Sequence, residues 1–328
     1  MKITANTALL LGTAIAIGSA APVWADAPGE LVEEFWESAH VEGARVGWLH
    51  TSVRKLEAEG GKRLRAAAEL DLTFKRHNAV VHLSRVNGSE ETPEGKVVGV
   101  FMRQGQDGGR PLTLTGVVED GRLHVRVDKG RIERRLRWSD EVVGLYRLEH
   151  LFQKRKPKTG DQWSLLRYEP TYNTVLTIHV AVKDREEVPA LPGAARVKLL
   201  RVEMTADKIE APGMRVQPPP VVWWLDDHFV PLRRQFELEG LGTVVLTRTT
   251  REAAKAPATP ARMADIGLKT LIPLNRAIAH PYSTRSAVYR ITLRGDSDPE
   301  SALARDDHQE VRNLKDDTFE LHVHPVQP

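Results

Sequence analysis

The sequence of 328 residues contains no cysteine. Three uses of cysteine in an exported protein are therefore excluded: a disulfide, a lipid-modified anchor and a thiol nucleophile. Stability must come from burial of apolar side chains and from hydrogen bonding within sheets. The apolar content of 41% is sufficient to fill a core in a chain of this length.

Motifs for catalysis and metal binding are also missing. There is no G-x-S-x-G turn of a serine hydrolase and no H-E-x-x-H zinc motif, and the 12 histidines are scattered. His322 and His324 share one face of a strand, but solvated histidines explain them better than a metal site. Asp226-Asp227-His228 is better explained as a tight turn than as a set of ligands. We expect no catalytic residue, no metal and no cofactor.

The N-terminus has the pattern of a secretory signal. Lys2 supplies a positive charge, and Ala8–Ala21 is apolar but too short to span a bilayer comfortably. Small residues at Val23 and Ala25 predict cleavage before Asp26, with an uncleaved anchor as the alternative. No later stretch is long and apolar enough to span a membrane. We therefore expect an exported protein, periplasmic or extracellular.

The net charge of +3 is close to neutral, so the sequence does not predict general binding to polyanions, and nucleic acid is not an expected partner. The strongest local charge is a basic run between residues 122 and 137. It contains Lys129 and six arginines: Arg122, Arg126, Arg131, Arg134, Arg135 and Arg137. This run fits the solvated face of an alternating strand. The functional alternative is contact with anionic envelope material or with another domain.

Alternation of apolar and polar residues with period 2 dominates the chain and predicts strands with one buried face. We expect strands at 47–57, 62–76, 174–182, 221–225, 229–238 and 242–250, and a hairpin that turns at Asp120-Gly121. The predicted fold is mainly β: a large, curved, half-barrel-like antiparallel sheet spanning residues 26–252.

Few helices are expected. Leu31–Ala39 has apolar residues at i, i+4 and i+8, which predicts a short amphipathic helix. A second helix, residues 139–155, should start at Ser139 as its N-cap and cross the sheet. An Ala/Pro-rich linker is predicted at 253–263. A small α+β or β unit should follow at 264–328, with strands at 285–294 and 318–323 and a short helix starting at Asp298.

Two adjacent tryptophans are the main candidates for ligand binding. Because neighbouring strand residues point to opposite faces, one of Trp223 and Trp224 can join the core while the other faces a ligand. Leu176 and Ile178 are predicted to line the same apolar face. The alternative is that the second tryptophan lies beneath the crossing helix.

The β-rich region loosely resembles the curved sheets of periplasmic lipoprotein carriers. The phrase Val222-Trp223-Trp224-Leu225-Asp226, followed by Pro231-Leu232-Arg233, is similar to the W-x-D…P-x-(R/K) hairpin of such sheets. This resemblance concerns the fold only.

Three segments resemble the N-terminal, non-catalytic region of exported bacterial (planctomycete-type) transglutaminase-like proteins. They are Glu91–Met102, Trp138–Phe152 and Ile266–Pro299. In that family a papain-like core with a Cys-His-Asp triad follows this region. No residue here matches the motif that bears the triad, and without a thiol the family's acyl transfer cannot occur in this chain.

Two functions follow as hypotheses. The resemblance implies an accessory region that positions substrate or docks a catalytic transglutaminase-like domain, with that domain or a substrate protein or peptide as partner. The alternative is a stand-alone periplasmic carrier that binds a lipid, acyl chain or lipoprotein on a concave apolar sheet.

Overall fold

The computed structural model describes residues 29–58, 61–76, 79–189, 195–211, 214–238, 241–256, 274–278, 280, 283–293 and 308–324. The predicted signal peptide lies outside these residues. The chain divides into two compact units, Met1–Leu271 and Ile272–Pro328.

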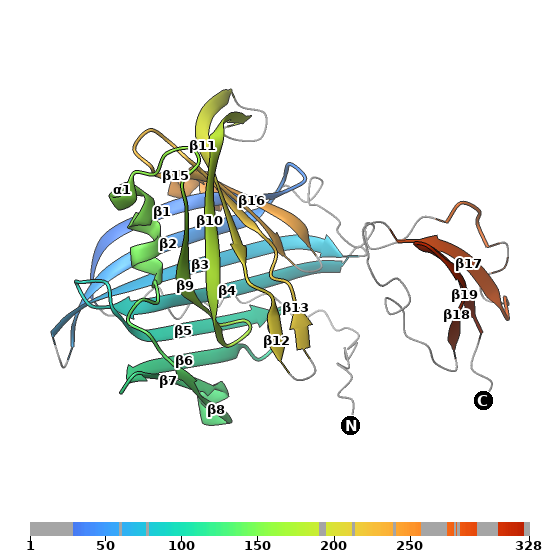
Figure 1. Ribbon diagram of the computed structural model, residues 1–328, viewed down its shortest axis with the longest axis horizontal. Coiled ribbons are helices and arrows are strands. Elements are labelled where there is room, and N and C mark those ends of the chain that lie inside the picture. Colours follow the sequence, from blue (N-terminus) through green and yellow to red (C-terminus); the bar gives the residue numbers. More distant parts are fainter. Residues whose placement is uncertain are drawn as a thin grey trace. The chain divides into compact units, whose positions relative to one another are not determined.

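The first unit is built on one antiparallel sheet of 14 strands, which confirms the predicted mainly β fold (Figure 1). Its strands are β1 (Glu30–Val41), β2 (Ala44–Ala58), β3 (Gly61–Arg76), β4 (Ala79–Glu91), β5 (Val97–Gln106), β6 (Leu112–Glu119), β7 (Arg122–Val127), β8 (Ile132–Arg137), β9 (Gln162–Glu169), β10 (Thr174–Pro189), β11 (Arg196–Ala206), β14 (Val221–Leu225), β15 (Pro231–Leu238) and β16 (Gly242–Thr249). A separate two-stranded ribbon pairs β12 (Ile209–Ala211) with β13 (Met214–Val216).

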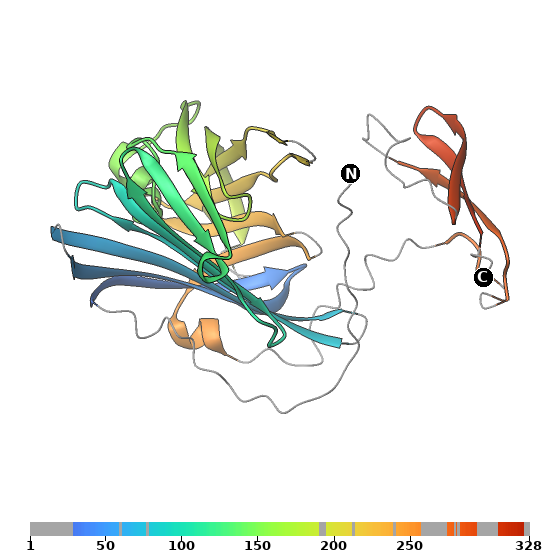
Figure 2. The ribbon, with the colours of Figure 1, turned by 90° about the horizontal axis from the view of Figure 1, so that it is seen from below.

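The spatial order of the large sheet is β8-β7-β6-β5-β4-β3-β2-β1-β16-β15-β14-β11-β10-β9. Almost all neighbours are consecutive in sequence, and the long-range pairing of β1 with β16 joins the two halves. The sheet curves strongly (Figure 2), as the right-handed twist of long strands favours. It does not close, because β8 and β9 form its two ends.

The predicted helix at 31–39 is wrong, because this segment is strand β1. It pairs with β2 on one side and with β16 on the other. An i, i+4, i+8 spacing is also an even spacing, so Phe35 and Ala39 share a face in a strand as they would in a helix. Pairing on both sides determines the outcome, which is a tertiary effect that local spacing does not reveal.

The crossing helix exists but begins later than predicted. Helix α1 (Leu145–Arg155) has Gly144 at its N-cap, not Ser139, whose hydroxyl instead accepts a bond from the Glu141 N–H. Between them, Val142 forms a parallel bridge with Leu166 of β9. Where the sequence predicted the first helical turn, the chain instead makes a turn at residues 140–141 and then bridges β9.

A short helix, α2 (Arg251–Lys255), covers the outer side of β1 and β2 and includes the first three residues of the predicted linker. The Thr250 hydroxyl caps it by accepting from the Ala253 N–H. Lys255 Nζ lies 4.9 and 5.0 Å from the ring centroids of Trp36 and Trp48. The predicted linker beyond residue 256 lies outside the described residues.

The second unit contains a three-stranded antiparallel sheet in the order β17-β19-β18. Its strands are β17 (Ala287–Thr292), β18 (Gln309–Lys315) and β19 (Thr318–Val323). Two of them were predicted, and β18 was missed because its sequence, QEVRNLK, alternates poorly. The helix predicted at Asp298 lies outside the described residues.

Candidate interaction surfaces and a filled interior

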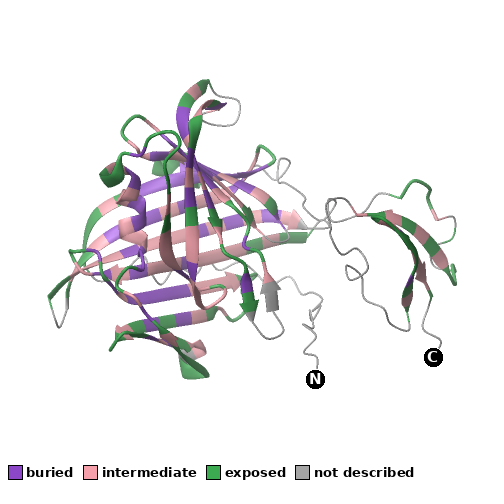
Figure 3. Cartoon of the chain, viewed as in Figure 1, coloured by how far each residue is buried: buried purple, intermediate pink, exposed green. Residues whose placement is uncertain are grey.

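Helix α1 lies against the concave face of β10, β11 and β14, where buried side chains gather (Figure 3). Phe152, fully buried, meets Trp223 edge-on, with ring centroids 5.5 Å apart. The same cluster contains Val143, Leu148, Val180, Val182, Leu200, Val202, Met204 and Leu225. The apolar side of the helix therefore covers this part of the sheet.

Strand β4 supplies the polar groups that hold the start of α1. The Ser89 hydroxyl accepts from the Leu145 N–H at 2.7 Å. Glu91, fully buried, accepts from the N–H groups of Tyr146 and Arg147 at 2.8 and 3.1 Å and from the Ser89 hydroxyl. Two side chains from a distant strand thus accept hydrogen bonds from amides that a local cap usually satisfies. The negative charge of Glu91 also interacts favourably with the positive N-terminal end of the helix dipole.

Gly144 makes this arrangement possible. A Cβ placed there would lie 2.3 Å from Glu91 Oε1 and 2.8 Å from Val97 Cγ2. Any larger residue would displace the carboxylate that caps the helix. Burial raises the pKa of Glu91, although its hydrogen bonds from Ser89 and the helix amides act to lower it.

A buried ion cluster links the middle of α1 to the sheet. Arg234 of β15 donates from Nη1 and Nη2 to the two oxygens of Glu149, at 2.9 and 2.5 Å. Its Nε lies 3.3 Å from Oε1 of Glu37 on β1, which is completely buried. The guanidinium also lies 4.3 Å from the Trp223 ring centroid. One arginine therefore serves two carboxylates and an aromatic face.

The charged groups of this cluster differ in how well they are paired. Burial raises the pKa of Glu37 to about 7, although Arg234 acts to lower it. Neither oxygen of Glu37 has a hydrogen-bond partner among the described residues. Burial alone would lower the pKa of Arg234, but the carboxylates of Glu149 and Glu37 raise it. The arginine is firmly charged, whereas Glu37 titrates near neutral pH.

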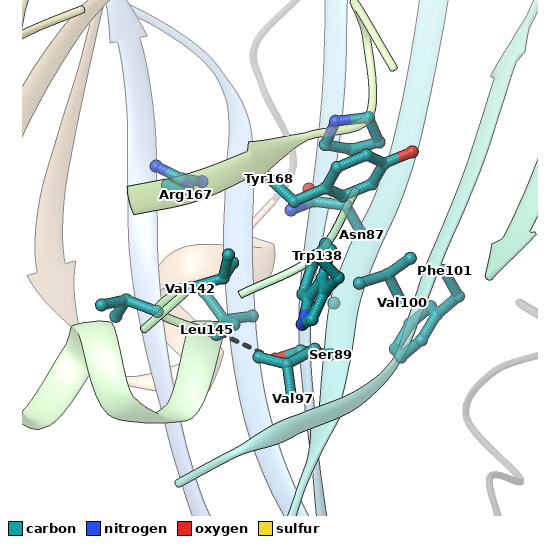
Figure 4. Close-up of a pocket in the computed structure, with 14 residues that line it drawn as sticks. Asn87, Ser89, Val97, Val100, Phe101, Trp138, Val142, Leu145, Arg167 and Tyr168 are labelled. Carbon is teal, nitrogen blue, oxygen red and sulfur yellow. Dashed lines mark hydrogen bonds between the residues drawn. The ribbon is translucent and has the colours of Figure 1, made fainter. Parts of the chain in front are cut away.

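The cavity beside the start of α1 is small. It measures about 40 Å³ and lies between β4, β5, the segment 138–145 and the end of β9. Figure 4 shows Trp138 at the centre of its lining, with Val142 on one side and Val100 on the other. A water molecule needs about 10–15 Å³ of such space, whereas small-molecule sites span about 300–1,000 Å³. This cavity accommodates water, not an acyl chain.

The predicted ligand residues lie on two faces of the sheet. Trp223 faces α1, and Ile178 packs in the same cluster, while Leu176 is also buried. Trp224 points to the other side, where it packs with Val188, Leu199 and Val222 and donates its Nε1–H to Glu186. Neither tryptophan lines an open concave surface in this conformation.

The predicted basic patch is exposed. Arg122, Arg126, Arg131, Arg134, Arg135 and Arg137 are all exposed on β7, β8 and the turn before β8. One carboxylate, Glu133, pairs with Arg126 at 3.3 Å. These residues form an exposed basic patch at the β8 end of the sheet.

A groove of about 420 Å³ on β9, β10 and β11 is lined by Ser164 and His179, which form a polar trio with Asp207 just after β11. The sequence did not reveal this trio. Ser164 Oγ lies 2.9 Å from His179 Nδ1, and His179 Nε2 lies 2.7 Å from Asp207 Oδ1. This composition matches a catalytic triad, but the ring is reversed, since the nucleophile of serine proteases meets Nε2. His179 and Asp207 side chains are 52% and 58% exposed, so water competes for both bonds.

No group of three or more His, Cys, Asp or Glu side chains among the described residues is placed to hold a metal ion. Asp226 shapes the predicted turn, since its Oδ1 accepts from the N–H groups of His228 and Val230. No described helix has the length and apolar character to cross a membrane.

No protein-family model and no curated protein matches the chain. Among solved structures, the crystal structure of a beta-barrel-like protein of a domain of unknown function, DUF1849, from Brucella abortus is similar, with a TM-score of 0.42 and 12% sequence identity. The match covers 66% of this chain and 95% of that one. A similarity of this degree carries no argument about function.

Proposed function

We propose that this chain is a non-catalytic docking region that positions a partner protein, as the accessory region of an exported transglutaminase-like system. The observation that carries the proposal is the contrast between interior and surface. Helix α1 covers the concave face of β10, β11 and β14 and the cavity beside it measures about 40 Å³, while the basic residues of β7 and β8 are exposed. Recognition by the outer surface is what this arrangement favours.

The resemblance of three segments to transglutaminase-like proteins supports the choice of partner. Two of those segments, 91–102 and 138–152, meet where Glu91 caps α1 and where Trp138 lines the small cavity. The resemblance therefore includes the residues that fix the start of α1 on the sheet. The partner that we propose is a papain-like catalytic domain with a cysteine nucleophile, which this chain does not contain.

The test combines the full chain with a purified transglutaminase-like catalytic domain from the same organism. Size-exclusion chromatography should show a complex, and saturating amounts of this chain should lower KM for the acceptor or donor protein. No complex at about 100 μM together with an unchanged KM would contradict the proposal, because transient interfaces are commonly detectable at this concentration.

A carrier function is the second candidate, and one observation favours it. Helix α1 covers, with Phe152, a continuous apolar face that includes Trp223, as a lid over an acyl site would. Binding would require the helix to leave its contacts with Glu91 and Arg234. Mass spectrometry of organic extracts from the purified chain tests this alternative: a stoichiometric lipid supports it, and a repeatedly empty preparation contradicts it.

A further inference from the structure

We infer that the free edge of β8 binds an extended acidic segment of a partner protein by strand addition. This inference rests on the proposed docking function and names the surface and the partner chemistry. It depends on three features of the described strands: an open edge, an unfavourable cross-strand arrangement of charge, and an alternation of faces.

The two ends of the large sheet differ in how they are covered. At β9, the Val143 N–H donates to the Leu166 carbonyl at 2.8 Å, so the preceding segment bridges this edge. At β8, the six residues pair with β7 only, and no second strand joins them in the part of the chain that the structure describes. An unpaired row of N–H and C=O groups is a template for another strand.

Like charges face each other across β7 and β8 at this edge. Arg122 of β7 lies directly opposite Arg137 of β8, whereas Arg126 lies opposite Glu133 and pairs with it. Like charges at directly opposite positions destabilise a sheet. Basic residues on an edge are common as protection against self-association, and here they would repel the β8 edge of a second copy. An acidic strand would instead relieve the repulsion.

The alternation of β8 specifies what the added strand should look like. Glu133, Arg135 and Arg137 share the face of Arg122, whereas Ile132, Arg134 and Leu136 share the opposite face. Leu136 packs against the core of β5–β7, while Ile132 is 52% exposed. The strand that fits therefore alternates acidic residues, which meet Arg135 and Arg137, with apolar residues, which lie on the side of Ile132 and Leu136. This is the β-augmentation mode of peptide recognition.

The test uses the full chain and a blocked seven-residue peptide of alternating glutamate and valine, with binding measured by calorimetry at low salt. We expect saturable binding that weakens at least tenfold when the central valine of the peptide is replaced by proline, which removes a backbone donor. Reversal of charge in Arg135→Glu/Arg137→Glu should weaken binding at least tenfold. The variant Arg135→Lys/Arg137→Lys should bind within about threefold of the native chain.

A matched control changes the same net charge elsewhere. Lys154→Glu/Lys208→Glu replaces two exposed lysines outside β7 and β8 and should leave binding within about threefold. Equal binding of the proline peptide, or of an oligothymidylate of equal charge, would overturn strand addition in favour of nonspecific attraction. Absence of peptide binding would also overturn it. A complex with the catalytic domain would then still support docking through another surface.

Discussion

Glu149 and Arg234 form a two-point ion pair, with Nη1–Oε1 and Nη2–Oε2 separations of 2.9 and 2.5 Å, between the only long described helix and the sheet beneath it. The same arginine faces Glu37, whose carboxylate has no other described partner. The position of α1 therefore depends on charge as well as on apolar packing, and three predictions follow from the groups that hold it.

Replacement of Arg234, the cation shared by Glu149 and Glu37, should destabilise the fold. Arg234→Met leaves two buried carboxylates unpaired, and we expect the free energy of unfolding to fall by about 3–5 kcal/mol in urea titrations. Arg234→Met combined with Glu149→Leu and Glu37→Leu should recover most of this loss, because an apolar set of similar volume replaces the whole cluster. Lys96→Met, which breaks the exposed pair with Asp140, serves as the control and should shift the midpoint far less. If Arg234→Met alone were as stable as the native chain, the Arg234–Glu149 pair would not be what holds the helix.

The raised pKa of Glu37 predicts a specific pH dependence. Its pKa is about 7 in the folded chain and about 4.5 as a free group. Between these values the folded state binds more protons, so the stability contributed by Glu37 is fully present below pH 4.5 and is lost as pH rises through 7. The loss is about 3 kcal/mol at 1.36 kcal/mol per unit. The difference in unfolding free energy between Glu37→Gln and the native chain should therefore grow from pH 4.5 to 7.5. A difference that is constant across this range would contradict the prediction.

Gly144 should tolerate no side chain. Gly144→Ala forces a Cβ into the space of Glu91 Oε1, so we expect a destabilisation of about 1–3 kcal/mol and loss of helical signal at the start of α1. Gly99→Ala is the matched control, because its nearest contact would be an ordinary 3.5 Å from the Gly116 carbonyl. Equal effects of the two substitutions would show that the trans cap contributes little.

The trio in the β9–β11 groove should not be a nucleophilic site. His179 presents Nδ1 to Ser164 and is half exposed, so the hydroxyl is not held in the buried geometry that activates a serine. We expect a fluorophosphonate probe to label the chain no more than it labels Ser164→Ala. Labelling that disappears in Ser164→Ala would instead identify an enzyme.

The sequence predicts a meander and several of its strands because alternation and turn residues act locally, but it gave no prediction of β4, β5, β9 or β11. The hairpin of β2 and β3 and the turn at Asp226 show this, since each depends on residues close together in the chain. Strand β1 could not be assigned in the same way. Its partner β16 is some 200 residues away, and its even spacing of apolar residues suits a helix equally well.

The groups around α1 are the other part that the sequence conceals. The start of the helix is set by Ser89 and Glu91 on a distant strand, so no local cap marks it. Glu37 gave one available signal, since an acid between Phe35 and Ala39 breaks the apolar face of a strand. That signal becomes visible only after β1 is recognised as a strand. The Ser164, His179 and Asp207 trio likewise requires the register of three strands.

Hydrogen exchange tests the central claim most directly. Exchange should be measured on the full chain alone and in complex with a cysteine-dependent transglutaminase-like catalytic domain. Docking on the outer edge predicts slower exchange of the amides in β8, residues 132–137, with exchange in α1, residues 145–155, unchanged. Altered exchange in α1 with β8 unaffected would contradict the account and would indicate that the helix opens to admit a ligand.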